Sequence, residues 1–260
     1  MTPEEMVSRL LYRDGMMLVI DKPAGMAVHR GSPNSKDRNR ESLEDHFDTL
    51  RFGLPRLPAL AHRLDRDTSG CLVLGRHRKA LAQLGKLFRN GTIDKTYWAL
   101  VEGIPDADEG VIELPLGRLD DKIGWWMKHD PQGQPAVTKW KVMGRTSLSG
   151  QNLTWLSLEL LTGRTHQIRV HCSEMGWPVV GDGIYGSAPR FGGPGLQLHA
   201  RTIAVPLYKN REPVRVTAPV AQHMKERLAQ CGWPGEDPNL FRIAAVEAEV
   251  ETETETDAAQ

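Results

Sequence analysis

The side chains best suited to chemistry are concentrated in residues 62–70, which read His-Arg-Leu-Asp-Arg-Asp-Thr-Ser-Gly. Five of the first six can carry charge, although the residues on both sides of the segment are apolar. A charged loop at the entrance of a buried strand takes polar groups into a low dielectric, which is costly unless arginine and carboxylate neutralise each other there. The segment is therefore either a structural ion-pair cluster or a functional site, because structural clusters of this kind also occur without chemistry.

If the segment is a site, Asp65 is its reactive carboxylate, with Arg63 and Arg66 beside it in the chain. A guanidinium about 4 Å from a carboxylate contributes on the order of 4 kcal/mol at a moderate dielectric, so Asp65 should stay ionised. An ionised carboxylate in a basic cleft suits nucleophilic attack or proton abstraction better than general-acid work. A glycosidase pair of Asp65 and Asp67 is disfavoured, because no further feature supports sugar binding.

Metal chemistry finds little support in the sequence. His166 and His171 are five residues apart, so they do not share a helix face as the i, i+4 pair of zinc hydrolases does. The cysteines Cys71, Cys172 and Cys231 are odd in number and show no paired metal spacing, which argues against a zinc site and a disulfide framework. We therefore expect no metal site.

Periodicity and turn residues predict the elements that position residues 62–70. Residues 71–75 are an apolar run that ends in glycine, typical of a buried strand. The turn at Asp14-Gly15 should join two strands, and a helix opening at residues 164–171 would leave Arg164 at a strand-to-helix turn. The remaining expected elements are helices over residues 77–90 and 220–230 and strands over residues 95–103, 153–160, 196–205 and 214–218.

Strands and hairpins with only a few helices favour an α+β fold built on a large, mostly antiparallel mixed sheet flanked by those helices. Two polar stretches, residues 31–40 and 117–135, are expected to be loops. The second contains Lys122, Trp125, Trp126 and Lys128. This mixture of cations and aromatic rings could stack on bases and hold phosphates, or the tryptophan pair could anchor the loop to the body of the protein.

Composition sets wider bounds. The chain has 260 residues with 40% hydrophobic content, enough for a substantial core, and no apolar run approaches the ~20 residues that span a bilayer. Six acidic residues and no lysine or arginine lie in residues 246–260, so the rest of the chain is net positive. We expect a cytoplasmic protein with one domain over residues 1–245 and a disordered acidic tail over residues 246–260.

Several segments resemble, in order, the motifs of the RluA family of pseudouridine synthases. Residues 62–70 resemble its signature, and the similarity runs from about residue 11 to residue 218. Its first motif is matched by residues 20–29, its tyrosine motif by Lys95-Thr96-Tyr97, its arginine motif by residues 163–171, and its last by Gly181-Asp182 with Tyr185-Gly186. The resemblance implies the pseudouridine synthase catalytic fold, with a central cleft, and an isomerase that needs no cofactor.

Carried over to this chain, the resemblance makes Asp65 the catalytic aspartate that starts the breaking of the uridine N-glycosidic bond. It implies that Tyr97 stacks on the target base, that Arg164 pairs with Asp65, and that Arg63 fills the gap left by the flipped base. It also implies supporting roles for His62 and Ile168 in the site. Contacts to RNA are expected from Lys22, Arg66, Arg169, Lys122 and Lys128.

The resemblance also bears on the substrate. Many relatives carry an N-terminal S4 RNA-binding domain, whereas here the family's first strand is expected near Leu10, so we expect RNA recognition to come from the catalytic domain itself. The expected substrate is a specific uridine in tRNA, in large-subunit ribosomal RNA, or in both, and the expected enzyme is a monomer that does not bind membranes. The alternative is a non-catalytic RNA-binding or ribosome-assembly factor that has kept the fold.

Overall fold

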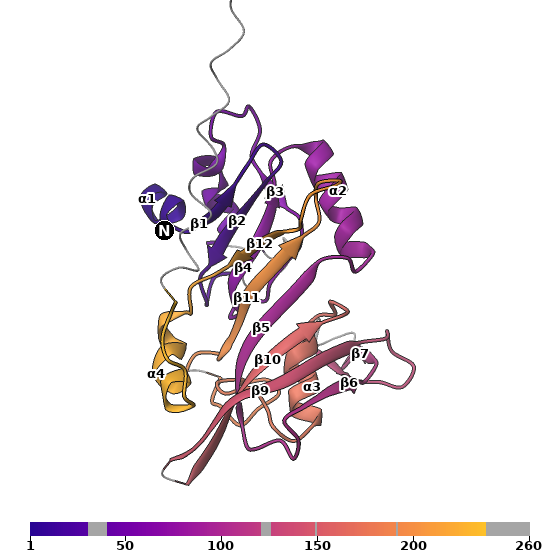
Figure 1. Ribbon diagram of the computed structural model, residues 1–260, viewed down its shortest axis with the longest axis vertical. Coiled ribbons are helices and arrows are strands. Elements are labelled where there is room, and N and C mark those ends of the chain that lie inside the picture. Colours follow the sequence, from indigo (N-terminus) through magenta and orange to yellow (C-terminus); the bar gives the residue numbers. More distant parts are fainter. Residues whose placement is uncertain (31–40, 121–125, 149, 191, 238–260) are drawn as a thin grey trace, which may run out of the picture.

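Ten strands form one mixed, mostly antiparallel sheet in the computed structural model, which describes residues 1–30, 41–120, 126–148, 150–190 and 192–237. Across the sheet the spatial order is β1 (Leu10–Arg13), β2 (Met17–Lys22), β4 (Ser69–Gly75), β11 (Leu198–Val205), β5 (Asp94–Glu102), β10 (Gln151–Leu160), β9 (Val137–Leu148) and β6 (Glu109–Glu113). β3 (Ala59–Leu60) pairs with β4, and β12 (Val214–Thr217) pairs with β11. The expected α+β architecture is confirmed (Figure 1).

The parallel contact between β4 and β11 joins the two halves of the sheet, and it is made by the last two residues of the 62–70 segment. Ser69 pairs with His199 and Gly70 pairs with Ala200. Gly70 has a φ of +103°, and a Cβ atom there would overlap the carbonyl oxygen of Ala200. Only glycine allows this conformation and this close approach of two backbones. The Asp65 loop is therefore fixed at the middle of the sheet.

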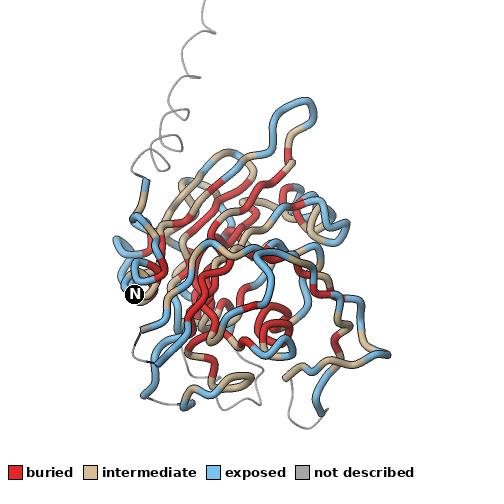
Figure 2. The backbone as a smooth tube through the Cα atoms, turned by 60° about the horizontal axis from the view of Figure 1, so that its bottom comes forward, coloured by how far each residue is buried: buried red, intermediate tan, exposed pale blue. Residues whose placement is uncertain are grey.

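Helices cover the two faces of the sheet unequally. The helical elements are α1 (Pro3–Ser8), the 3-10 helix η1 (Leu43–Leu50), α2 (Arg78–Arg89), α3 (Gln167–Glu174) and α4 (Gln222–Gln230). Successive side chains of a strand point to opposite faces, so Tyr97 of β5 joins the core cluster with Ile168, while Leu100 joins the cluster that contains Met224 of α4. Hence α4 covers the face away from Tyr97, on the other side of the view from α2 and α3 (Figure 1). Buried residues follow the central strands in Figure 2.

Most of the predicted elements are present, with two differences. The helix of the arginine motif begins at Gln167, later than expected, because His166 has a left-handed φ of +53° and the chain before it turns. Part of the predicted loop at residues 117–135 is a separate two-stranded ribbon of β7 (Leu116–Arg118) and β8 (Met127–His129). Trp126 lies next to this ribbon under the guanidinium of Arg190, at 4.6 Å from its ring centroid, which supports the anchoring interpretation for that residue.

Some expectations fall outside the described residues. These are the loop at residues 31–40, Lys122 and Trp125 in the ribbon connection, and the acidic tail at residues 246–260. They stay predictions, as does the domain boundary at residue 245. Within the part of the chain that is described, no helix is both long enough and apolar enough to cross a bilayer.

Candidate active site

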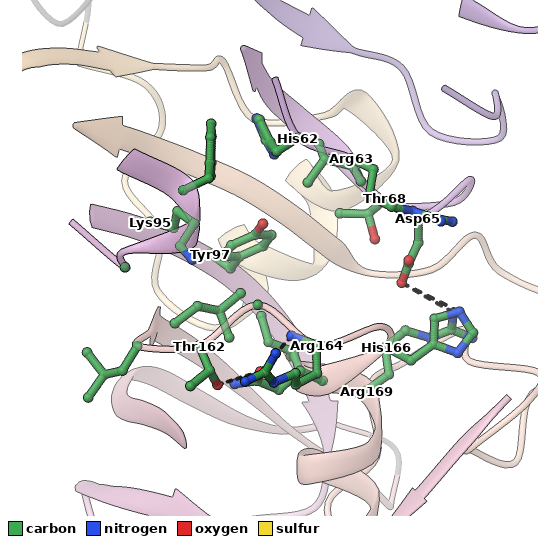
Figure 3. A pocket seen from close by; sticks show the side chains of 18 of the residues that line it. His62, Arg63, Asp65, Thr68, Lys95, Tyr97, Thr162, Arg164, His166 and Arg169 are labelled. Carbon is green, nitrogen blue, oxygen red and sulfur yellow. Dashed lines mark hydrogen bonds and ion pairs between the residues drawn. The ribbon is translucent and has the colours of Figure 1, made fainter. Parts of the chain in front are cut away.

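A cavity of about 580 Å³ opens on the Tyr97 face of the sheet (Figure 3). Its walls come from the loop before β4, the end of α2, strand β5, the segment that runs from the end of β10 into α3, and Leu198 of β11. Five regions of the sequence therefore meet at one place. The lining residues include most of the predicted site, namely His62, Arg63, Asp65, Tyr97, Arg164, Ile168 and Arg169.

The loop that carries Asp65 is stabilised by hydrogen bonds from the side chain of Lys22. The Nζ atom of Lys22 donates hydrogen bonds to the carbonyl oxygens of Pro23, Arg66 and Thr68 at 2.8, 2.8 and 2.9 Å. Lys22 is completely buried, and this burial lowers its pKa to about 7 against the opposing charges of nearby aspartates. The prediction that Lys22 contacts RNA is therefore wrong, because all three of its protons are committed to backbone carbonyls inside the protein.

The carboxylate of Asp65 faces two nitrogen-bearing side chains without bonding tightly to either. Its Oδ2 atom lies 3.7 Å from Nε2 of His166 and 3.8 Å from Nη1 of Arg169. Both distances exceed the 2.7–3.2 Å of an N–H···O hydrogen bond. The side chain of Asp65 is 19% exposed. The carboxylate is thus held in a positive environment while its oxygens stay available to a substrate.

The arginine beside Asp65 is Arg169, so the expected pairing with Arg164 is wrong. Arg164 lies in the turn before α3, where its Nε atom donates to the carbonyl oxygen of Pro135 at 3.0 Å. Arg169 lies in the first turn of α3, on the side that faces the sheet, and is only 6% exposed. This position makes Arg169 part of the cavity wall, whereas the sequence assigned it a contact to RNA at the surface.

Arg169 is itself oriented by Asp182. The carboxylate of Asp182 accepts hydrogen bonds from Nε and Nη2 of Arg169 at 2.7 and 2.8 Å, and from the backbone N–H groups of Ile184 and Tyr185. Burial alone would raise the pKa of Asp182, but these hydrogen bonds and the arginine charge hold it below its usual value. Only Nη1 of Arg169 is left to face Asp65.

The turn between β10 and α3 is stabilised by the buried side-chain amide of Gln167. Its Oε1 atom accepts from the hydroxyl of Thr162 at 2.7 Å and from the backbone N–H of Arg164 at 3.0 Å. Its Nε2 atom donates to Val137 O and Thr138 Oγ1 on β9. This amide therefore fixes the turn against the sheet. The sequence did not identify Gln167, because nothing in the local pattern shows that its side chain is buried.

His166 is a second residue that sequence reasoning missed, having considered it only as a zinc ligand. Its Nδ1 atom lies 2.7 Å from the hydroxyl of Tyr185. Burial lowers the pKa of His166 to about 4, although the charge of Asp65 opposes the shift. The imidazole is therefore neutral near pH 7. The usable signal in the sequence was its place in the same motif as Arg164 and Arg169.

The apolar part of the cavity is built around Tyr97. Tyr97 is 8% exposed, and Ile168 and Leu198 beside it in the lining are buried as well. Burial raises the pKa of Tyr97, so the phenol stays neutral. A neutral aromatic ring in an apolar wall offers a stacking surface for a planar base.

The contacts of His62 indicate a structural role rather than a part in the reaction. Its Nε2 atom accepts a hydrogen bond from the backbone N–H of Val73 at 3.0 Å, and its ring stacks on Phe88 with centroids 4.4 Å apart. Burial lowers the pKa of His62 to about 3, so it is neutral. It ties the start of the Asp65 loop to β4.

Several cations lie at the rim of the cavity or near it. Arg63 is exposed at the rim, and Lys95 of β5 lines the wall without a hydrogen bond or ion pair to any described residue. Arg66 pairs with Asp67 at 3.4 Å in an exposed position, and Lys128 is exposed on β8. In the described ranges, no three histidine, cysteine or acidic side chains gather where they could hold a metal ion.

Comparison with known proteins gives consistent matches. The RNA pseudouridylate synthase family matches residues 16–174, a range that contains every lining residue of the cavity except Leu198. An uncharacterized RNA pseudouridine synthase of Zymomonas mobilis subsp. mobilis is 39% identical over 217 residues, covering 83% of this chain and 94% of that protein. Ribosomal large subunit pseudouridine synthase C of Vibrio cholerae serotype O1 is 34% identical over 232 residues, covering 85% and 68%. The solved structure of human RNA Pseudouridylate Synthase Domain Containing 4 is similar with a TM-score of 0.71 at 25% identity, covering 88% of this chain and 95% of that chain.

Proposed function

Because this chain belongs to the RluA family of RNA pseudouridylate synthases, which isomerise uridine to pseudouridine in RNA, we propose that Asp65 is its catalytic carboxylate. The observation that carries this proposal is that Asp65 is the only acidic side chain among the described residues that line the cavity. Its Oδ2 atom faces His166 and Arg169 without a tight hydrogen bond to either. A carboxylate in this state can act on the sugar or the base of a bound uridine.

The reaction needs little from the protein besides this carboxylate and a closed space. The glycosidic bond between N1 and the ribose breaks, the base turns while it is held, and a bond from C5 to the ribose replaces the first. The proton of C5 is released and N1 regains one, so substrate and product contain the same atoms. Tyr97 keeps the detached base in the cavity by stacking on it, and Ile168 completes the apolar wall.

The target uridine reaches Asp65 by base flipping. A base inside folded RNA cannot touch a carboxylate that is 19% exposed at the bottom of a cavity, so it must leave its stack, at a cost of a few kcal/mol. A cavity of about 580 Å³ is large enough for one nucleoside. Arg63, exposed at the rim, takes the place of the flipped base.

The RNA is held through phosphates around the rim. Arg63, Arg89, Lys95 and Arg164 all line the cavity, Arg66 is exposed next to Asp65 in the chain, and Lys128 is exposed on the β7–β8 ribbon. Relatives named for the ribosomal large subunit support an uridine of large-subunit ribosomal RNA as the substrate, with tRNA as the second candidate. We propose that the reaction takes place in the cytoplasm, and that the enzyme is a monomer that uses no metal or cofactor.

The test uses purified full-length protein and RNA labelled with tritium at C5 of uridine, which is released as the C5 proton leaves. Wild-type protein should release tritium, and D65N should release none while binding the RNA with the same Kd. D67N is the matched control, because Asp67 lies two residues away, is 49% exposed and does not line the cavity. Carbodiimide mapping of RNA from cells with and without the gene for this protein identifies the uridine that is modified. Tritium release by D65N at the wild-type rate would refute the role of Asp65, and a wild-type protein without any release would favour the non-catalytic RNA-binding alternative.

A further inference from the structure

A continuous series of polar contacts leads from the β7–β8 ribbon to Asp65. The backbone N–H of Met127 on β8 donates to the hydroxyl of Tyr185 at 2.8 Å. The same hydroxyl lies 2.7 Å from Nδ1 of His166, whose other ring nitrogen, Nε2, lies 3.7 Å from Oδ2 of Asp65. Figure 3 shows the His166 ring turned toward the Asp65 carboxylate across the end of the cavity.

The hydrogen atoms of this series can be assigned from its chemistry. A neutral imidazole carries one N–H, and burial keeps His166 neutral. The Tyr185 oxygen already accepts from Met127, so its own hydrogen is free to be donated to Nδ1 of His166. The imidazole hydrogen then lies on Nε2 and faces the carboxylate. The opposite tautomer would turn the Nε2 lone pair toward a negative charge, which is unfavourable.

The surrounding structure holds this arrangement in place. The His166 side chain has no exposed surface, and its backbone lies in the left-handed region, which is uncommon for residues other than glycine. The Tyr185 ring contacts His166 edge-on, and its backbone N–H is bound by Asp182. The same Asp182 orients Arg169. Among the described residues, the charged groups that act on the pKa of the imidazole include Asp65, Arg169, Asp182 and Arg63.

We infer that His166 is a positioning residue for Asp65, and that the Tyr185 hydroxyl sets the tautomer which lets His166 present its Nε2–H to the carboxylate. This inference rests on the proposed function of Asp65. His166 touches neither base nor sugar in this role. It fixes the direction of one carboxylate oxygen, and the contact closes from 3.7 Å to a hydrogen bond when the substrate fills the cavity, as catalytic hydrogen bonds commonly do.

Y185F tests the inference with the smallest possible change, because it removes one hydroxyl and keeps the ring. Under single-turnover conditions with saturating enzyme, its rate should fall about tenfold, the effect of one lost orienting hydrogen bond, while the Kd for RNA stays unchanged. Y208F is the matched control, because the Tyr208 hydroxyl is bonded to Asp14 and lies outside the cavity. Y208F should lower the free energy of unfolding and leave the single-turnover rate unchanged. A wild-type rate for Y185F, or a loss explained wholly by Kd, overturns the inference.

A second pair of variants separates the side chain of His166 from its backbone. H166Q and H166L must both adopt the left-handed φ of +53°, so they share that conformational cost. Only glutamine retains an N–H near the position of Nε2. H166Q should therefore keep at least about ten times the single-turnover rate of H166L. Equal rates at equal melting temperatures would show that the side chain acts only by filling space, contrary to the inference.

Nitrogen NMR of labelled protein provides a measurement that does not depend on activity. The His166 resonances should show the Nε2–H tautomer in wild-type protein and a loss of that preference in Y185F. A purely structural Tyr185 would leave the tautomer unchanged, and an Nδ1–H tautomer in wild-type protein would overturn the inference. If wild-type protein released no tritium while the Nε2–H tautomer was present, the proposed function would fail and the geometry of the contact would still stand.

Discussion

Arg169 is bound by Asp182 through two hydrogen bonds of 2.7 and 2.8 Å, and this pairing determines which part of the guanidinium faces the Asp65 loop. Because Nε and Nη2 are used by Asp182, only Nη1 faces Asp65, at 3.8 Å. The charge of Arg169 is therefore shared between a structural carboxylate and the proposed catalytic one. This sharing places a positive charge beside Asp65 without blocking its oxygens by a bidentate salt bridge.

The difference between Arg169 and Arg164 can be measured. R169K should lower the turnover of RNA about 100-fold or more, since lysine cannot bind Asp182 through two nitrogens and still face Asp65. R164K should lose less than about tenfold, because among the described residues the Arg164 head group hydrogen-bonds only to the carbonyl of Pro135. Steady-state kinetics on the two variants provide the comparison. A larger loss for R164K than for R169K would restore the pairing expected from the sequence.

Lys22 should prove to be a stability residue. K22M removes the donor shared by Pro23, Arg66 and Thr68 and leaves three buried carbonyls without it, so the free energy of unfolding should fall by about 2–4 kcal/mol even after the relief of burying a cation. Urea unfolding measures this change. Unchanged stability together with weaker RNA binding would instead support the surface contact that the sequence suggested.

Gly70 should tolerate no side chain. G70A forces an alanine into φ +103° and drives its Cβ into the backbone of Ala200, which should cost about 3 kcal/mol or more or prevent folding. G15A is the control, because a Cβ at Gly15 meets nothing within 4 Å and its φ is not positive. Thermal unfolding of the two variants decides the question, and equal melting temperatures would contradict the close approach of β4 and β11.

Lys95 should contribute to RNA affinity through a phosphate. It lies in the cavity wall, and its amine has no hydrogen bond or ion pair to a described residue. K95M should weaken binding at low salt and reduce the slope of log K against log salt by roughly one. K225M, on α4 behind the sheet, should leave the slope unchanged. Affinity titrations between low and high salt test both, and an unchanged slope for K95M would rule out the phosphate contact.

Acid should destabilise the protein through its buried neutral histidines. His199 is completely buried beside Ser69, and burial lowers its pKa to about 3 from 6.5. Below about pH 6.5, His199 is therefore protonated in the unfolded chain but stays neutral in the folded protein. The free energy of unfolding is at its full value above that pH. It falls as the pH falls below it, by about 1.4 kcal/mol per pH unit for each such histidine. H199N retains a polar partner for Ser69 without this titration. Urea unfolding at several pH values should show a shallower acid loss for H199N, and identical slopes would refute this account.

Local patterns in the sequence were sufficient to predict the fold class, and they also pointed to Asp65, the carboxylate for which we propose the catalytic role. Alternation and turn residues predicted most of the strands that the structure contains, because side-chain direction along a strand depends only on neighbouring residues. The charge pattern of residues 62–70 singled out Asp65 for the same reason, since the cost of placing charge beside apolar strands is a local property.

The partners of Asp65 were decided only by the tertiary structure. Arg164 and Arg169 belong to one motif, and which of them faces a loop about 100 residues away depends on where α3 begins and how Gln167 seats it against β9. Lys22 was expected at the surface because a buried lysine is costly, and only the three carbonyls that surround it in space offset that cost. The contact between His166 and Asp65 likewise depends on a left-handed residue and a distant tyrosine. Local periodicity specifies the face on which a side chain lies, whereas long-range packing specifies what it meets there.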